Sequence, residues 1–374
     1  MPEPVLIEPD VQFIKTVQRT GGCDVKKCYQ CATCSVVCNL SPDEAPFPRK
    51  QMLEAQWGLR ERLLGDPAIW LCHNCGDCTT KCPRGARPGA VFGALRSQAV
   101  MRYAWPGFFA RLVASPKGLP VLVLIPAVLF AVFAYLMRSW EHSAGHAAPG
   151  PQFADMFPLI PLEIFFFTLS GLIILGFVVS VARFVRGIRA SGARGSILAG
   201  LVPSAVEIMT HSRFAKCVAE KKRFWGHLLT FWGFVALAGI STIEGFAVMF
   251  GVMKTPLPFW DPERLVESFL KIGAHAATVA ILAGLVIMLV DRFQDPAKRA
   301  ASTYFDWFFL VLLTSVVLTG ILSETLRLLG ADPAMFGIYF VHLTLIFMLF
   351  AYTPYSKFAH IVYRTIAMAA TRKG

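Results

Sequence analysis

Eight of the ten cysteines form two runs that share one spacing, C-x2-C-x2-C-x3-C. The first run comprises Cys28, Cys31, Cys34 and Cys38, and the second comprises Cys72, Cys75, Cys78 and Cys82, with Pro83 directly after it. Three closely spaced thiolates on a tight loop can hold three irons of one cubane, and this spacing binds [4Fe–4S] clusters. We therefore predict two clusters and an electron-transfer function for this part of the chain.

The fourth cysteine of each run is expected to begin a helix that carries it to the other cluster, as in bacterial two-cluster ferredoxins. One cluster would be held by Cys28, Cys31, Cys34 and Cys82, and the other by Cys72, Cys75, Cys78 and Cys38. Two alternatives stay open. Zinc sites would more typically show separate C-x2-C pairs, and a plant-type [2Fe–2S] site starting at Cys23 would leave Cys34 and Cys38 unused. Cys23 and Cys217 are interpreted as ordinary thiols.

Length and composition indicate a membrane domain after these runs. The chain has 374 residues, and 55% of them are hydrophobic, more apolar surface than a soluble protein of this size could bury. Six segments are long and apolar enough to span a membrane, near 119–137, 158–182, 225–250, 272–290, 305–326 and 335–356. The predicted fold is mainly α, with a small two-[4Fe–4S] ferredoxin-type helical domain at 1–104 and a six-helix transmembrane bundle at 105–374.

Loop charge predicts the orientation of this bundle. Segments 183–224, 291–306 and 357–374 contain nine, three and four Lys or Arg, whereas 138–157, 251–271 and 327–334 contain one, three and one. By the positive-inside rule, the N-terminal domain, the C-terminus and a basic loop at 183–224 lie on the cytoplasmic side of the inner membrane. One or two helices of that loop would lie on the membrane surface. The net charge of +12 is interpreted as this loop charge, facing membrane lipid and not nucleic acid. The first residues, MPEPVLIEPD, show no secretory signal, which agrees with cytoplasmic thiols.

Four histidines lie in or at the ends of the predicted spans: His227, His275, His342 and His360. Polar groups inside a membrane are costly and tend to be functional. His342 and His360 are 18 residues apart, which on one helix is five complete turns and about 27 Å, close to the thickness of the hydrocarbon layer. One helix would thus offer a ligand near each membrane surface, with Pro354 as a possible bend between them.

The predicted topology pairs His227 with His360 on the inner side and His275 with His342 on the outer side. Two bis-histidine haems explain both pairs, and the absence of C-x-x-C-H predicts b-type haems. A single haem, or structural histidines, are the alternatives. The other four histidines are given other roles. His211 is interpreted as a reserve inner ligand that lies outside the bilayer, and His73 as an exposed residue. His142 and His146 are interpreted as surface residues of an outer loop.

With both cofactor patterns in one chain, a family resemblance emerges. Residues 20–100 resemble the iron–sulfur C subunit of heterodisulfide reductase. Residues 105–360 resemble the haem-bearing E subunit of that enzyme and the gamma subunit of nitrate reductase, where one late helix carries two haem histidines at this spacing. The fusion resembles the C subunit of the quinone-interacting membrane-bound oxidoreductase (Qmo) complex of sulfate-reducing bacteria. The stretch HSRFAKCVAEKKRFWGHLLTFWGF, residues 211–234, is similar in style to the segment before that family's first haem helix.

The resemblance implies menaquinone as the lipid substrate, two cytoplasmic flavin-binding partners and, through them, electron exchange with adenylylsulfate reductase. It also implies that the chain works as a subunit of a quinol-oxidising enzyme complex. The quinone pocket is expected beside the outer haem, with an inner pocket as the alternative. Candidates for binding quinone or handling protons there are Lys271, Glu244, Arg264 and Glu324. Rival functions are the same relay run in reverse as a quinone reductase and a non-respiratory membrane redox sensor.

Overall fold

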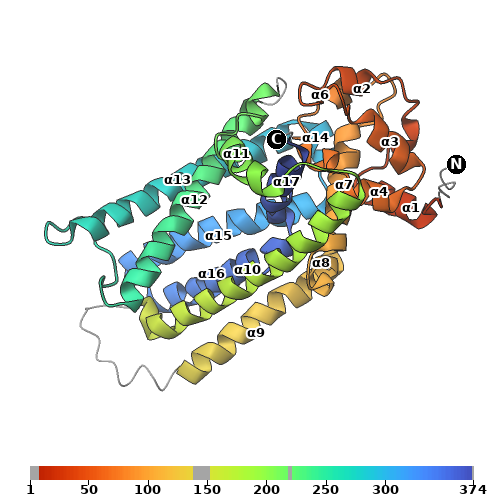
Figure 1. Ribbon diagram of the computed structural model, residues 1–374. Coiled ribbons are helices and arrows are strands. Elements are labelled where there is room, and N and C mark those ends of the chain that lie inside the picture. The colour runs from red at the N-terminus through yellow and green to blue at the C-terminus, as the bar shows by residue number, and fades with distance from the viewer. Residues whose placement is uncertain (1–7, 138–151, 218–220, 373–374) are drawn as a thin grey trace.

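The computed structural model describes residues 8–137, 152–217 and 221–372, and all regular elements in them are helices (Figure 1). The N-terminal part contains α1 (Val11–Arg19), α2 (Thr33–Val36), α3 (Arg49–Gln56), α4 (Arg60–Gly65), α5 (Ala68–Leu71), α6 (Asp77–Thr80), α7 (Pro88–Tyr103) and α8 (Gly107–Val113). The remainder contains α9 (Leu119–Met137), α10 (Leu159–Ala190), α11 (Ile197–Met209), α12 (Lys221–Met249), α13 (Leu265–Gln294), α14 (Pro296–Ala301), α15 (Tyr304–Leu328), α16 (Asp332–Ala351) and α17 (His360–Thr371).

Six of the described helices are long and apolar enough to cross a membrane: α9, α10, α12, α13, α15 and α16. Large apolar side chains point outward along them; on α10, for example, Leu172 is 63% exposed. In water such surfaces would be unfavourable, so they fit contact with lipid. The mainly helical fold with six spans is therefore confirmed.

Some spans continue beyond their predicted ends. The second was predicted at 158–182, but α10 runs to Ala190 and takes in the first residues of the expected basic loop 183–224. Arginines can extend an apolar helix because their stems cover apolar surface while the charge stays in a polar environment. Among the described residues of that loop, α11 is the one α-helix that lies wholly inside it, since α10 ends and α12 begins within 183–224.

The helix expected to carry both His342 and His360 is broken. Helix α16 ends at Ala351, two 3-10 turns follow, and α17 begins at His360. Pro354 lies in the first turn, where it lacks an N–H and its ring would clash with the preceding helical turn. The Tyr352 hydroxyl donates a hydrogen bond to the carbonyl of Leu122 at 3.0 Å, which anchors the break. The single-helix prediction is therefore wrong.

Helix α17 joins the membrane helices to the cysteine-rich part. Arg364 donates from Nε to the carbonyl of Trp70 and from Nη2 to that of Cys72, both at 2.8 Å. The Trp70 ring stacks on Tyr363 with a centroid separation of 5.1 Å. On another face, the carbonyl of Ala370 accepts a hydrogen bond from the N–H of Gly195, just before α11.

Helices α11, α14 and α17 lie together at the end of the bundle that carries the cysteine-rich part (Figure 1). They come from the three segments to which the charge pattern assigned one common side: 183–224, 291–306 and 357–374. The fold therefore gathers the basic segments next to the cysteine runs.

Replacing Arg364 by Met is expected to destabilise the docking of α17. The Trp70 carbonyl and His73 Nδ1, which lies 3.2 Å from Arg364 Nη1, would lose this partner, and the Cys72 carbonyl would keep only its bond from Arg96. An unsatisfied buried acceptor costs about 1–3 kcal/mol. The thermal unfolding midpoint of the full chain in detergent should fall clearly. Arg60→Met is the matched control, because the Arg60–Asp10 ion pair is exposed and 3.7 Å long. Equal shifts for both variants would contradict the bridging role.

Candidate cofactor sites

The two cysteine runs fold into loops of the same conformation. In the first, Gln30 and Ala32 flank Cys31 with φ of +69° each; in the second, Asn74 and Gly76 flank Cys75 with φ of +54° and +90°. Left-handed backbone is costly for side chains such as those of Gln and Ala, so it persists where surrounding structure demands it. After each loop a short helix begins, α2 in the first run and α6 in the second.

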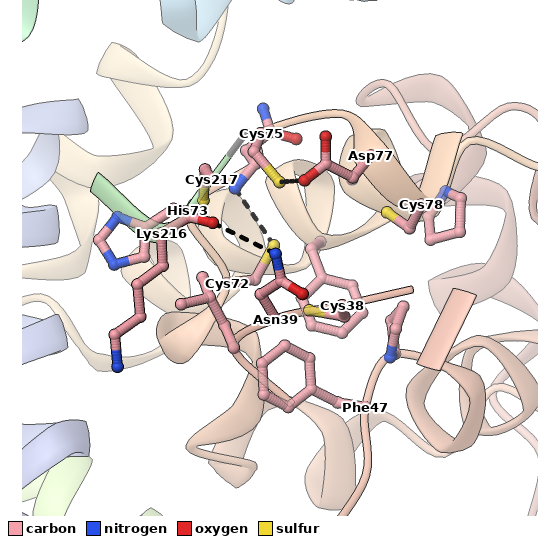
Figure 2. A pocket seen from close by; sticks show the side chains of 16 residues that line it. Cys38, Asn39, Phe47, Cys72, His73, Cys75, Asp77, Cys78, Lys216 and Cys217 are labelled. Carbon is pink, nitrogen blue, oxygen red and sulfur yellow. Dashed lines mark hydrogen bonds between the residues drawn. The ribbon is translucent and has the colours of Figure 1, made fainter. Parts of the chain in front are cut away.

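These loops surround two pockets. The first is lined by Cys28, Cys31, Cys34 and Cys82. The second is lined by Cys38, Cys72, Cys75 and Cys78 (Figure 2). The structure thus brings together the two groups of four that the spacing predicts, with each fourth cysteine in the other run's pocket.

N–H groups donate to the sulfurs of both pockets. The N–H of Asn74 points to Cys72 Sγ and that of Ala86 to Cys82 Sγ, both at 3.3 Å, and Gln30 Nε2 lies 3.4 Å from Cys28 Sγ. Such donors stabilise anionic sulfur, so the donor set fits an iron–sulfur cluster in each pocket. Cys23 does not line either pocket; its sulfur accepts from Arg87 Nη2 at 3.0 Å.

Arginines surround the backbone of the second run. Besides Arg364, Arg96 donates to the carbonyl of Cys72 at 3.1 Å and Arg223 to that of Asn74 at 2.6 Å. In the part of the chain that the structure describes, no ion pair joins Arg364 or Arg96 to a carboxylate. Burial lowers the pKa of Arg364 to about 9. An anionic cluster in the second pocket would supply the compensating charge.

His73 is not exposed as predicted. It is half-buried, its ring stacks on Phe214 at 5.4 Å, and burial together with the charge of Arg364 lowers its pKa. The amino-acid pattern carries no sign of this, because Phe214 lies in the basic segment between α11 and α12 and reaches His73 only through the tertiary fold.

Three histidines meet at the end of the spans next to the cysteine-rich part. The rings of His227 and His360 are 6.2 Å apart between centroids. His211 Nε2 lies 2.9 Å from His227 Nδ1, and His211 is only 6% exposed with a φ of +53°. His211, predicted to be a reserve ligand outside the bilayer, contacts His227 directly and is therefore part of this group.

The four predicted haem ligands share one hydrogen-bonding pattern. Nδ1 of His360 bonds the carbonyl of Lys357 at 2.6 Å, and Nδ1 of His275 bonds that of Lys271 at 2.8 Å. Nδ1 of His342 lies 2.9 Å from Thr319 Oγ1, and that of His227 contacts His211. No hydrogen bond to Nε2 of these four occurs among the described residues. A metal-binding histidine is typically oriented in this way through its other nitrogen, so the set fits haem ligation.

The pair predicted for the outer side, His275 and His342, is less closely assembled. His275 contacts the ring of Phe259 at 4.7 Å. His342 lies on α16 against Gly320 of α15, where a Cβ would come within 3.0 Å of the imidazole. Within the described ranges, no direct contact joins His275 and His342.

The structure also places the quinone-site candidates. Lys271 Nζ binds Glu324 Oε1 at 2.6 Å, and Arg327 binds the same carboxylate at 3.0 Å. Glu244 lies within electrostatic range of Lys271 and Glu324. Arg264 instead pairs with Glu267 and the carbonyl of Lys254. Lys271, one turn before His275 on α13, is thus paired with Glu324, whereas Arg264 is bound elsewhere.

A row of ring contacts connects the group of His211, His227 and His360 with the second pocket. The ring of His227 lies 5.9 Å from that of Phe214, which stacks on His73 next to Cys72. On α17, His360 and Arg364 are one turn apart, so this helix touches both sites. Sequence reasoning missed the roles of Phe214 and Arg364, since no motif marks either residue.

A family profile described as a 4Fe-4S dicluster domain matches residues 24–86. This range includes both cysteine runs and excludes Cys23, so the N-terminal part is an iron–sulfur domain of the two-cluster kind. No solved structure matches the chain.

Comparison with known proteins finds relatives of both halves. The chain is 32% identical over 102 residues to the C subunit of the H(2):CoB-CoM heterodisulfide,ferredoxin reductase of Methanothermobacter thermautotrophicus, covering 27% of this chain and 52% of that protein. It is 30% identical over 159 residues to the E subunit of the dihydromethanophenazine:CoB--CoM heterodisulfide reductase of Methanosarcina acetivorans, covering 41% and 60%.

A third relative spans nearly the full length. The chain is 24% identical over 380 residues to "Citrate utilization protein B" of Escherichia coli, covering 97% of this chain and 92% of that protein. By contrast, the chain spans about half the length of the Methanothermobacter relative. Together with the six spans and the dicluster domain, these relatives indicate a multi-pass membrane protein with an electron-transfer role in an oxidoreductase complex.

Proposed function

We propose that this protein is the membrane subunit of a quinol-oxidising complex and passes electrons from menaquinol to soluble partners. The observation that carries this proposal is the continuous contact between the inner histidines and the second cysteine pocket. His227, Phe214 and His73 touch in sequence, and α17 carries both His360 and Arg364. Electron transfer between the bilayer and the soluble domain needs a site in the membrane that contacts a cluster site.

Two b haems and two [4Fe–4S] clusters, when bound, would supply one-electron transfer. The chain's own residues would hold and orient them. His227 and His360 would hold one haem at the inner end, and His275 and His342 would hold the other at the outer end. Each of these histidines is oriented through its Nδ1. Each cysteine pocket would hold one cluster. Packing of Trp70, Tyr363 and Phe184 between the halves would exclude water from the junction.

We place quinol oxidation beside His275. Quinol releases two protons with its two electrons, so its site needs polar groups within the apolar spans. Glu244, Lys271 and Glu324 supply them, and the carbonyl of Lys271 also orients His275. In this proposal Lys271 binds a quinone oxygen and Glu244 takes up the protons, because the Glu324 carboxylate is already paired with Lys271 and Arg327.

The proposed partners are two flavin-binding subunits on the cytoplasmic side, which would exchange electrons with adenylylsulfate reductase. Support comes from the resemblance to the Qmo complex and from relatives that are named as subunits of reductases. The cysteine domain and the basic ends of the spans would face the cytoplasm, as loop charge predicts.

The crossed ligand sets predict which substitutions act on the same cluster. Cys38→Ser and Cys72→Ser should both remove the cluster of the second pocket, and Cys28→Ser and Cys82→Ser that of the first. Each variant should fall from about eight to about four irons per chain. Electron paramagnetic resonance of the reduced full-length protein identifies which signal is lost. Cys23→Ala is the control and should keep both signals. The assignment is wrong if Cys38→Ser removes the same signal as Cys28→Ser.

His342→Ala tests the membrane part. We expect the purified complex to fall from two haems to one per chain, measured by a reduced-minus-oxidised spectrum. Reduction of the remaining haem by a menaquinol analogue should slow at least tenfold, because the outer site lies between quinol and the inner site in this proposal. His142→Ala makes the same chemical change at a residue outside the described ranges that the sequence predicts to be on the surface, and it should change neither quantity.

Two results would contradict the proposal. A wild-type complex without a b-type absorption band would remove the haem assignment. Fast menaquinol reduction of the inner haem in His342→Ala would place the quinone site on the inner side.

A further inference from the structure

A fifth cysteine lies in the second cluster pocket. Cys217, from the segment between α11 and α12, lines it together with Cys38, Cys72, Cys75 and Cys78 (Figure 2). Its side chain is only 7% exposed, and its thiol lies within hydrogen-bonding reach of the Cys75 thiol. A buried thiol among four cluster ligands is not explained by packing alone.

The segment before Cys217 is held against the pocket at several points. The Phe214 ring stacks on His73, and the carbonyl of Lys216 accepts a hydrogen bond from Asn39 Nδ2 at 3.3 Å. Asn39 directly follows Cys38, so the segment contacts both cysteine runs. These contacts fix the backbone next to Cys217 and thereby hold its thiol near Cys75.

The chemistry of the pocket decides what this thiol can do. A cubane takes four thiolates, and the pocket supplies four from the two runs. Cys75, once it binds iron, has no proton, so an S–H between the two sulfurs belongs to Cys217. Asp77 Oδ2 lies 3.3 Å from Cys75 Sγ and can only add negative charge as a carboxylate. Cys217 is thus a neutral side-chain donor at this sulfur, beside the backbone N–H of Asp77.

We propose that Cys217 donates an S–H hydrogen bond to the cluster ligand Cys75 and so raises the reduction potential of the second-pocket cluster. This inference rests on the proposed pair of clusters. A hydrogen bond to a cluster sulfur stabilises the more negative reduced state, which makes the cluster a better electron acceptor. The donor comes from the membrane half of the chain. Docking of the two halves therefore tunes the cluster that lies nearest to the inner histidines.

The test is a redox titration of the full-length protein followed by electron paramagnetic resonance. In Cys217→Ala, the reduced-to-oxidised ratio of one cluster at a fixed ambient potential should fall about tenfold, which is about 59 mV for one electron. The second cluster should not shift, and the iron content should stay at the wild-type value. Cys217→Ser, which keeps a donor, should shift less. The affected signal should be the one that Cys38→Ser removes.

Cys23→Ala is the matched control, because Cys23 is exposed and lines neither pocket. It should leave both potentials unchanged. Three outcomes would overturn the inference: no shift in Cys217→Ala, an equal shift of both clusters, or loss of about half the iron, which would make Cys217 a ligand. A wild-type protein without two cluster signals would instead overturn the proposed function.

Discussion

The half-buried guanidinium of Arg364 forms the interactions on which the arrangement of the two sites depends. It binds the carbonyls of Trp70 and Cys72 and contacts His73, so one side chain fixes the second cysteine loop on helix α17. A buried cation without a carboxylate partner is unfavourable unless another negative group is near. A thiolate-bound cluster in the adjacent pocket meets that need. The same charge that holds the halves together therefore also favours the reduced form of this proposed cluster.

The four predicted haem ligands are also held in place by specific hydrogen bonds. In each of the four, Nδ1 is bound by a carbonyl, a hydroxyl or another imidazole, which leaves Nε2 as the nitrogen for a metal. Orientation by a fixed partner lowers the conformational entropy that ligation would otherwise cost. For His227 that partner is His211, which is held in left-handed backbone. Such strain persists at positions that the surrounding structure over-determines.

The sequence predicted what is local or periodic. Cysteine spacing and the fold agree on two groups of four thiols, because the spacing itself sets the loop and the following helix. The six apolar segments correspond to six candidate membrane spans, because length and apolar composition can be read directly from the sequence. The contacts that join the halves, from Arg364, Phe214 and Cys217, were not predicted, since each joins residues far apart in the chain and no motif marks it. Helix ends were also missed, because arginine-rich turns carried α10 beyond its apolar core.

The break after α16 changes how the inner site must be understood. An unbroken helix would have kept His360 on the same membrane-spanning helix as His342, with about 27 Å between the two residues along the helix axis. Instead α16 ends at Ala351, and the turns around Pro354 start a new helix whose first residue is His360. That helix packs on α5 and α11, and one turn after His360 it binds the second cysteine loop. The inner histidine site, formed by His227 of α12 and His360 of α17, thus lies where the membrane helices meet the cysteine-rich part.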